Sequence, residues 1–194
     1  NGGPWGHYAT EVTRLLNAMG VTVIGQFPGY MKLEDLPKVT SAEAMVVLGG
    51  KGNTHNGLEN LTKVLQEKFG FKYLQDIYPV GWERTQQWIL EMGNLLNCEV
   101  QAQAVLAAEQ LAMAKSLERF LKVTKDKKTT LCIGRWLMYF HPESMLGVVK
   151  NLQLDLRGIV LLDALEAGYF EEMVATLRKY TDVPICSNLD GEKL

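Results

Sequence analysis

The residues with the greatest potential for binding chemistry follow a short apolar segment in the first half of the chain. Residues 45–48 are apolar without alternation, which is typical of a strand covered on both faces of a parallel sheet. A helical spacing of apolar residues resumes over residues 58–69. The candidate binding residues between them are Gly49, Gly50, Lys51, Asn53, Thr54 and His55. We predict that the glycines of this loop bring its backbone close to a ligand; a solvated turn is the alternative.

A second polar turn follows another predicted strand. Residues 129–134 are strand-like, Gly134 and Arg135 come at their end, and Pro142 is placed where a helix would start. The Arg135 guanidinium suits a carboxylate or phosphate, although a surface arginine paired with a local acid is the alternative. Because ligands of open α/β sheets bind outside the carboxyl ends of the strands, we predict that both polar turns face a ligand.

The cysteines and histidines form no local metal or disulfide motif. Cys98, Cys132 and Cys186 are too few and too scattered for a disulfide framework or a CxxC knuckle, and no histidine has a partner at metal-finger spacing. Cys132 and Cys186 lie in apolar runs, where we predict buried thiols that act as small hydrophobic residues. We therefore predict no metal site within one segment and expect a cytoplasmic protein. No pairing of a nucleophile with a base identifies a catalytic residue.

Composition limits the classes of partner. The chain has 194 residues, of which 47% are hydrophobic and 22% charged, and it can bury a substantial core. Its net charge of -2 gives no electrostatic reason to expect nucleic acid or an anionic membrane as a partner. No run reaches the roughly 18 apolar residues that a membrane-spanning helix needs. The chain begins at Asn1 without an initiator methionine, so we expect a piece of a longer protein.

Strands and helices alternate in two parts of the chain. The predicted strands span residues 21–27, 45–48, 71–77, 129–134, 157–164 and 183–188. The predicted helices span residues 8–19, 33–36, 58–69, 142–152 and 169–179, with two long helices and no strand between residues 83 and 123. This order predicts an α/β fold of two Rossmann-like modules, each a parallel sheet flanked by helices, joined by a long helix. The expected boundaries are residues 1–97, 98–126 and 127–194.

The order of several short motifs resembles the nitrogenase component 1 family. The motifs are GGPW, MGVTVIGQFPGY, LQEKFGFKY, PVGWERTQQWI and KKTTLCIGR. The resemblance runs in register over nearly the whole chain. The chain is similar to the alpha subunit of the molybdenum–iron protein, and the family also includes related scaffold proteins and dark-operative protochlorophyllide reductase subunits. It implies a three-domain subunit of which this chain is the second domain and the start of the third. It also implies two partners, a homologous component 1 subunit and an ATP-hydrolysing iron protein that supplies electrons.

The resemblance implies a cofactor, but the chain departs from the family at the cofactor loop. Family members hold iron–sulfur clusters or a tetrapyrrole between such domains, and their cofactor cysteine lies in the loop after the strand that corresponds to residues 45–48. Here the loop reads GGKGNTHNG and has no cysteine. Its only imidazole belongs to His55, for which local hydrogen bonding or helix capping is the alternative to metal ligation. In the second turn, the family's paired glycines become Gly134 and Arg135.

Two functional hypotheses remain. In the first, the parent protein is a nitrogenase-like oxidoreductase subunit, and the cleft between the modules holds a cluster, a tetrapyrrole or an organic substrate against the eight residues of the two polar turns. In the second, the protein is a non-catalytic carrier or scaffold of the same architecture, which the missing cysteine favours. Electron transfer from a reductase partner would distinguish the two hypotheses, since a carrier would only bind.

Overall fold

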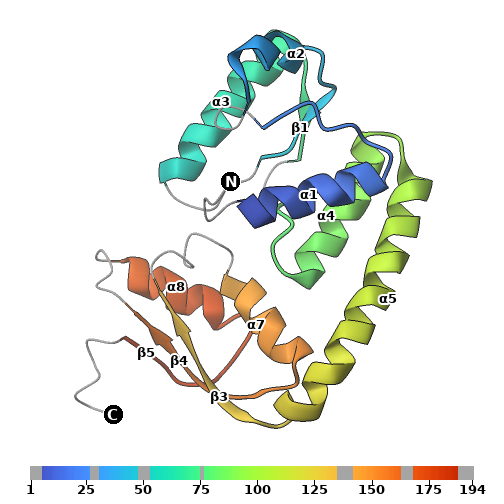
Figure 1. Cartoon of the computed structure of the whole chain (residues 1–194). Helices are drawn as coiled ribbons and strands as arrows, with labels where there is room; N and C mark the ends of the chain where they lie inside the picture. Colours follow the sequence, from blue (N-terminus) through green and yellow to red (C-terminus); the bar gives the residue numbers. More distant parts are fainter. Residues whose placement is uncertain are drawn as a thin grey trace. The chain divides into compact units, whose positions relative to one another are not determined.

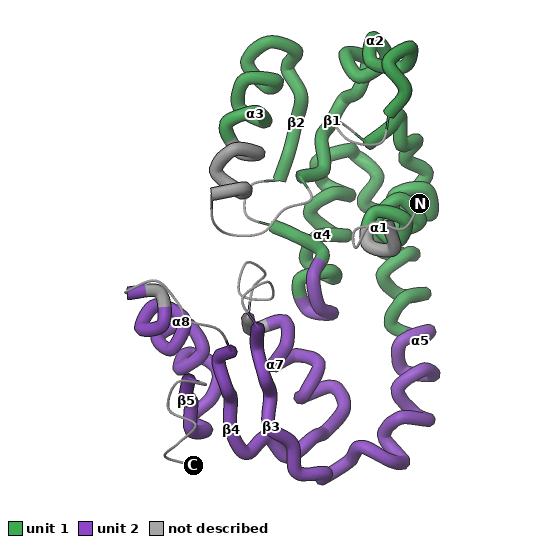
Figure 2. The backbone as a smooth tube through the Cα atoms, turned by 60° about the vertical axis from the view of Figure 1, so that its left-hand side comes forward, with its two compact units in different colours: residues 1–49, 53–79, 84–110 green, residues 50–52, 80–83, 111–194 purple. Residues whose placement is uncertain are grey.

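The computed structural model describes residues 6–26, 31–47, 53–74, 77–134, 142–162 and 168–187, with the backbone alone for residues 6–8, 53–59, 142, 143 and 169. The chain forms two compact units (Figure 2). Unit 1 contains residues 1–49, 53–79 and 84–110, and unit 2 contains residues 50–52, 80–83 and 111–194.

Unit 1 combines helices with a two-stranded parallel sheet (Figure 1). Strand β1 (Ala44–Met45) pairs with β2 (Lys72–Tyr73), so that Ala44 lies opposite Lys72 and Met45 opposite Tyr73. The helical elements are α1 (Gly6–Ala18), the 3-10 turn η1 (Leu33–Asp35), α2 (Leu36–Val39), α3 (Asn53–Phe69), α4 (Trp82–Leu95) and the first half of α5 (Glu99–Thr124). Two residues of α4, at its start, belong to unit 2.

The core of unit 1 lies where α1, α4 and α5 meet. Its buried residues recur at helical spacing and are Val12, Leu15, Leu16 and Met19 of α1 with its C-terminal turn, Trp88, Ile89 and Met92 of α4, and Ala102 and Val105 of α5. The α4 and α5 backbones approach closely, because a Cβ added to Gly93 would lie 2.5 Å from the Ala102 Cβ. Hydrophobic burial along these helix faces therefore holds unit 1 together.

Unit 2 contains a three-stranded parallel sheet in the order β3-β4-β5. The strands are β3 (Lys128–Ile133), β4 (Asp155–Leu161) and β5 (Ile185–Ser187), and the connecting helices are α7 (Pro142–Asn151) and α8 (Tyr169–Leu177). Successive right-handed crossovers in one direction place both helices on the same face of a sheet. The core agrees with this rule: Ile133, Ile159 and Leu161 of the sheet pack with Met173 and Leu177, and Leu146 of α7 packs against the same cluster.

The fold class predicted from the sequence is confirmed. Both sheets are parallel and both are flanked by helices. The two long helices predicted between residues 83 and 123 are α4 and α5, and the alternation of strand and helix after residue 127 is present in the predicted order. The helix α5 is continuous from residue 99 to residue 124, and the division between the units falls within it.

The strand predicted at residues 21–27 is wrong for residues 21–26, which form no strand; residue 27 lies outside the described residues. Val21 and Val23 instead pack against the core of unit 1. Their alternation with polar residues reflects this packing, whereas a strand also needs a neighbour to accept its backbone hydrogen bonds.

Two other strand predictions and one prediction of burial need correction. The strand predicted at residues 45–48 is shorter, since β1 ends at Met45 and residues 46 and 47 are outside any strand. Within the strand predicted at residues 71–77, Lys72–Tyr73 form β2, residues 71, 74 and 77 are outside any strand, and residues 75 and 76 lie outside the described residues. Cys132, predicted to be buried, is exposed. It lies on β3 between Leu131 and Ile133, which belong to the core side, so strand alternation turns its side chain to the opposite face.

Candidate functional site

The predicted loop after β1 is shorter than the sequence suggested. Helix α3 begins at Asn53, so Asn53, Thr54 and His55 belong to its first turn. Gly49, Gly50 and Lys51 lie outside the described residues. Asparagine and threonine are favoured near the start of a helix, which explains why the helix begins before the apolar spacing resumes. The predicted loop extends through Gly57 because apolar residues at helical spacing resume only at residue 58.

The amino ends of the two strands of unit 1 are joined by direct contacts. The Lys72 backbone N–H donates to the Glu43 carbonyl oxygen at 3.0 Å, and the Lys72 Nζ forms an ion pair of 2.6 Å with the Glu43 carboxylate. These contacts lie before β1 and at the start of β2, whereas the predicted binding residues follow the carboxyl end of β1. In parallel sheets, the carboxyl edge is the side on which ligands bind.

At the carboxyl edge of the unit 2 sheet, the pairing of β3 with β4 extends one residue past the end of β4. The Leu162 N–H donates to the Ile133 carbonyl oxygen at 2.9 Å, so β3 and β4 remain paired up to their ends. Gly134 follows directly, and a Cβ added to it would meet nothing within 4 Å. Its backbone does not have a positive φ. With respect to the described residues, Gly134 is therefore bordered by open space at the carboxyl edge of the sheet, and Arg135 lies outside the described part of the chain.

None of the three cysteines lies beyond the carboxyl end of a described strand. Cys98 lies between α4 and α5 and packs against the core of unit 1; burial first, and then the charge of Glu99, raise the pKa of its thiol. Cys132 on β3 and Cys186 on β5 lie level with Val160 on the central strand. Among the described residues, no group of three or more His, Cys, Asp or Glu side chains could hold a metal ion.

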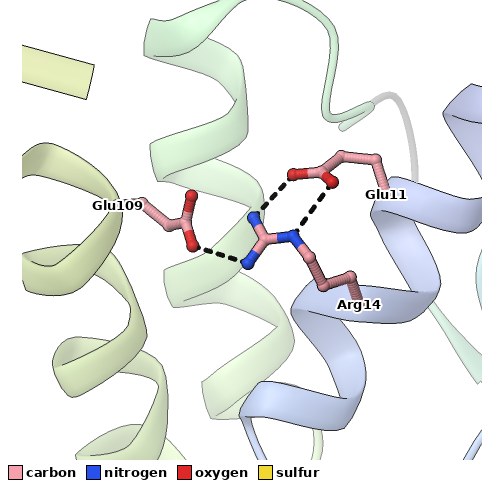
Figure 3. A network of polar contacts seen from close by, with 3 residues as sticks. All are labelled: Glu11, Arg14 and Glu109. Carbon is pink, nitrogen blue, oxygen red and sulfur yellow. Dashed lines mark hydrogen bonds and ion pairs between the residues drawn. The ribbon is translucent and has the colours of Figure 1, made fainter. Parts of the chain in front are cut away.

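A charged network links α1 to α5 (Figure 3). The Arg14 guanidinium donates to both carboxylate oxygens of Glu11, at 2.9 Å and 2.6 Å, and to Glu109 of α5 at 2.8 Å. The Glu11 and Glu109 carboxylates raise the pKa of Arg14, and the Arg14 hydrogen bonds lower that of Glu11. Because its hydrogen bonds join two helices of the unit 1 core, this network serves packing.

The sequence matches one protein family over nearly its whole length. Residues 3–184 match the family described as nitrogenase component 1 type oxidoreductase. The chain belongs to this family. The match confirms the family inferred from the order of the short motifs. No curated protein matches the sequence.

The nitrogenase component 1 type fold is also found among solved structures. Nitrogenase Cp1 structures at pH 5 and pH 6.5 each superpose with a TM-score of 0.60 at 16% identity over 91% of this chain. The chain spans about a third of those nitrogenase chains, 32% and 35%. A possible iron-binding (periplasmic solute-binding) protein from Staphylococcus epidermidis superposes with a TM-score of 0.50 at 12% identity, over 93% of this chain and 87% of that one. At these identities the likeness concerns the fold alone.

Membership of the nitrogenase component 1 type family does not by itself assign the site. The structure places Asn53, Thr54 and His55 at the start of α3 and Gly134 directly after β3, in different units.

Helix α5 is the longest helix described, but none of the described helices is both long and apolar enough to cross a membrane.

Proposed function

We propose that this chain belongs to an oxidoreductase subunit of the nitrogenase component 1 type and that it binds a redox cofactor or substrate at the carboxyl ends of its parallel strands. The family match over residues 3–184 is the observation that carries this proposal. The parallel strands support it, because ligands of such sheets bind at the carboxyl edge. The proposed binding residues are Gly49, Gly50, Lys51, Asn53, Thr54, His55, Gly134 and Arg135.

The chemistry of these residues favours polar and cationic contacts to the ligand. Lys51 and Arg135 are cations that can bind carboxylate groups, and the Arg guanidinium can do so with two parallel hydrogen bonds. No described residue lies within 4 Å of a Cβ placed at Gly134, which supports the approach of a ligand to the backbone there. A tetrapyrrole or another organic redox molecule with carboxylate groups fits this set of donors.

An iron–sulfur cluster held by thiolates of this chain does not fit. Such clusters are held by cysteine thiolates, and none of the three cysteines lies in a segment that follows the carboxyl end of a strand. Cys98 is part of the packing of unit 1, and Cys132 and Cys186 lie within strands. We therefore propose that any cluster of the whole protein is held by thiolates outside this chain.

The proposed electron donor is an ATP-dependent iron protein, and the second proposed partner is a homologous component 1 subunit. Both proposals rest on the family, whose members work with such partners. The bound cofactor or substrate would accept the electrons, while this chain would bind and orient it and exclude water from it. We further propose that the protein works in the cytoplasm.

Analysis of the whole protein's iron and acid-labile sulfide tests the role assigned to the cysteines. The variant Cys98→Ser, Cys132→Ser, Cys186→Ser is purified anaerobically beside the wild type, and circular dichroism shows whether both are folded. We expect the same iron and sulfide content per protein in both. Loss of iron from a folded variant would contradict the proposal that this chain supplies no cluster ligand.

A non-catalytic carrier or scaffold of the same fold is the second candidate. It is favoured by the absence of cysteine from residues 49–57, where the family resemblance implies a cofactor ligand. A carrier would bind its ligand through the same polar residues, but the ligand would not be reduced by the iron protein. Ligand binding without reduction would therefore favour the carrier.

A further inference from the structure

We draw no further inference here: the strongest candidate, the exposed apolar stripe that Val100, Ala104, Ala107 and Leu111 form along helix α5, is an unpartnered helix face, and nothing in the structure shows what covers it.

Discussion

At the scale of single residues, Gly93 permits the close approach of α4 and α5. A Cβ at this position would lie 2.5 Å from the Ala102 Cβ, and neither atom belongs to a flexible side chain that could move away. We expect Gly93→Ala to lower the free energy of unfolding by about 1–3 kcal/mol, as overpacked core substitutions do. Urea denaturation followed by circular dichroism measures this change.

Gly147 provides the matched control for Gly93. It lies inside helix α7, and a Cβ added to it would meet nothing within 4 Å. Gly147→Ala should therefore stabilise the protein by roughly 0.5–1 kcal/mol through helix propensity. Equal effects of the two substitutions would contradict the close packing of α4 against α5.

The carboxylate of Glu11 gives unit 1 a specific pH dependence. Hydrogen bonds from Arg14 hold the pKa of Glu11 below its ordinary value, so the contribution of this pair to stability is present above the ordinary pKa and is lost as the pH falls through the lowered one. The side chains are about half exposed, so the contribution is about 0.2–1 kcal/mol. Glu11→Gln should be less stable than the wild type by this amount at pH 7 and equal to it in strong acid, in parallel denaturation series.

At the scale of elements, the position at which helix α3 begins differs between the sequence-based prediction and the structure. The sequence pattern predicts a loop at residues 53–57, whereas the structure places these residues in the helix. Gly57→Ala should therefore stabilise the protein by roughly 0.5–1 kcal/mol. If Gly57 instead belonged to a turn that needs a positive φ, the substitution would be destabilising. Thermal unfolding of the single variant distinguishes these outcomes.

Two glycines of unit 2, Gly81 before α4 and Gly134 after β3, should respond differently to substitution by alanine. Gly81 has a φ of +77°, and a Cβ there would lie 2.9 Å from the Ser144 Cβ, while the Ser144 hydroxyl donates to the Val80 carbonyl at 2.8 Å. We expect Gly81→Ala to cost about 1–3 kcal/mol of stability. Gly134→Ala should change stability by less than about 0.5 kcal/mol, because no described residue lies within 4 Å of the added Cβ.

The same Gly134 position also tests the proposed site. Gly134→Val in the whole protein places a larger side chain beside the backbone, where no described residue lies within 4 Å of the added Cβ, and should weaken binding of the cofactor or substrate in a protein that still unfolds cooperatively. Unchanged ligand content in a stable Gly134→Val protein would show that the ligand does not approach this edge of the sheet.

The elements differ in how far the sequence could predict them. The helices α4 and α5 were predictable because Trp88, Ile89 and Met92 repeat at helical spacing and the alanine-rich stretch after them has a high helix propensity. Helical spacing and helix propensity depend on residues that are close in the sequence, so the sequence alone reveals them. Strand pairing depends on distant neighbours, so the apolar pattern of residues 21–26 could not reveal that Val21 and Val23 pack on helices without joining a sheet.

The candidate site was predictable only in part. Parallel strands followed by polar turns pointed to their carboxyl ends, and Gly134 lies there with no described residue within 4 Å of an added Cβ. The length of the first loop was overestimated because glycine and asparagine signal both turns and the starts of helices. The exposure of Cys132 was missed, since an apolar run alone does not show that one face of a strand lacks a covering helix.

At the scale of the whole molecule, the chain is an α/β protein of the nitrogenase component 1 type, arranged as two units that share helix α5. Fold and family do not determine chemistry, and the structural likeness to a solute-binding protein shows that related architectures occur in proteins named for binding alone. The distinction between enzyme and carrier therefore rests on whether the bound ligand accepts electrons.

The most direct measurement follows the visible absorption of the whole protein, purified anaerobically with its bound cofactor or substrate, after addition of an iron protein and MgATP. The proposed oxidoreductase function predicts that the absorption of the bound molecule changes on reduction, only when both the iron protein and ATP are present. As a control, the iron protein must reduce its own nitrogenase in the same buffer. If the protein then retains its ligand but its absorption does not change, the result would contradict the proposed function and favour a carrier.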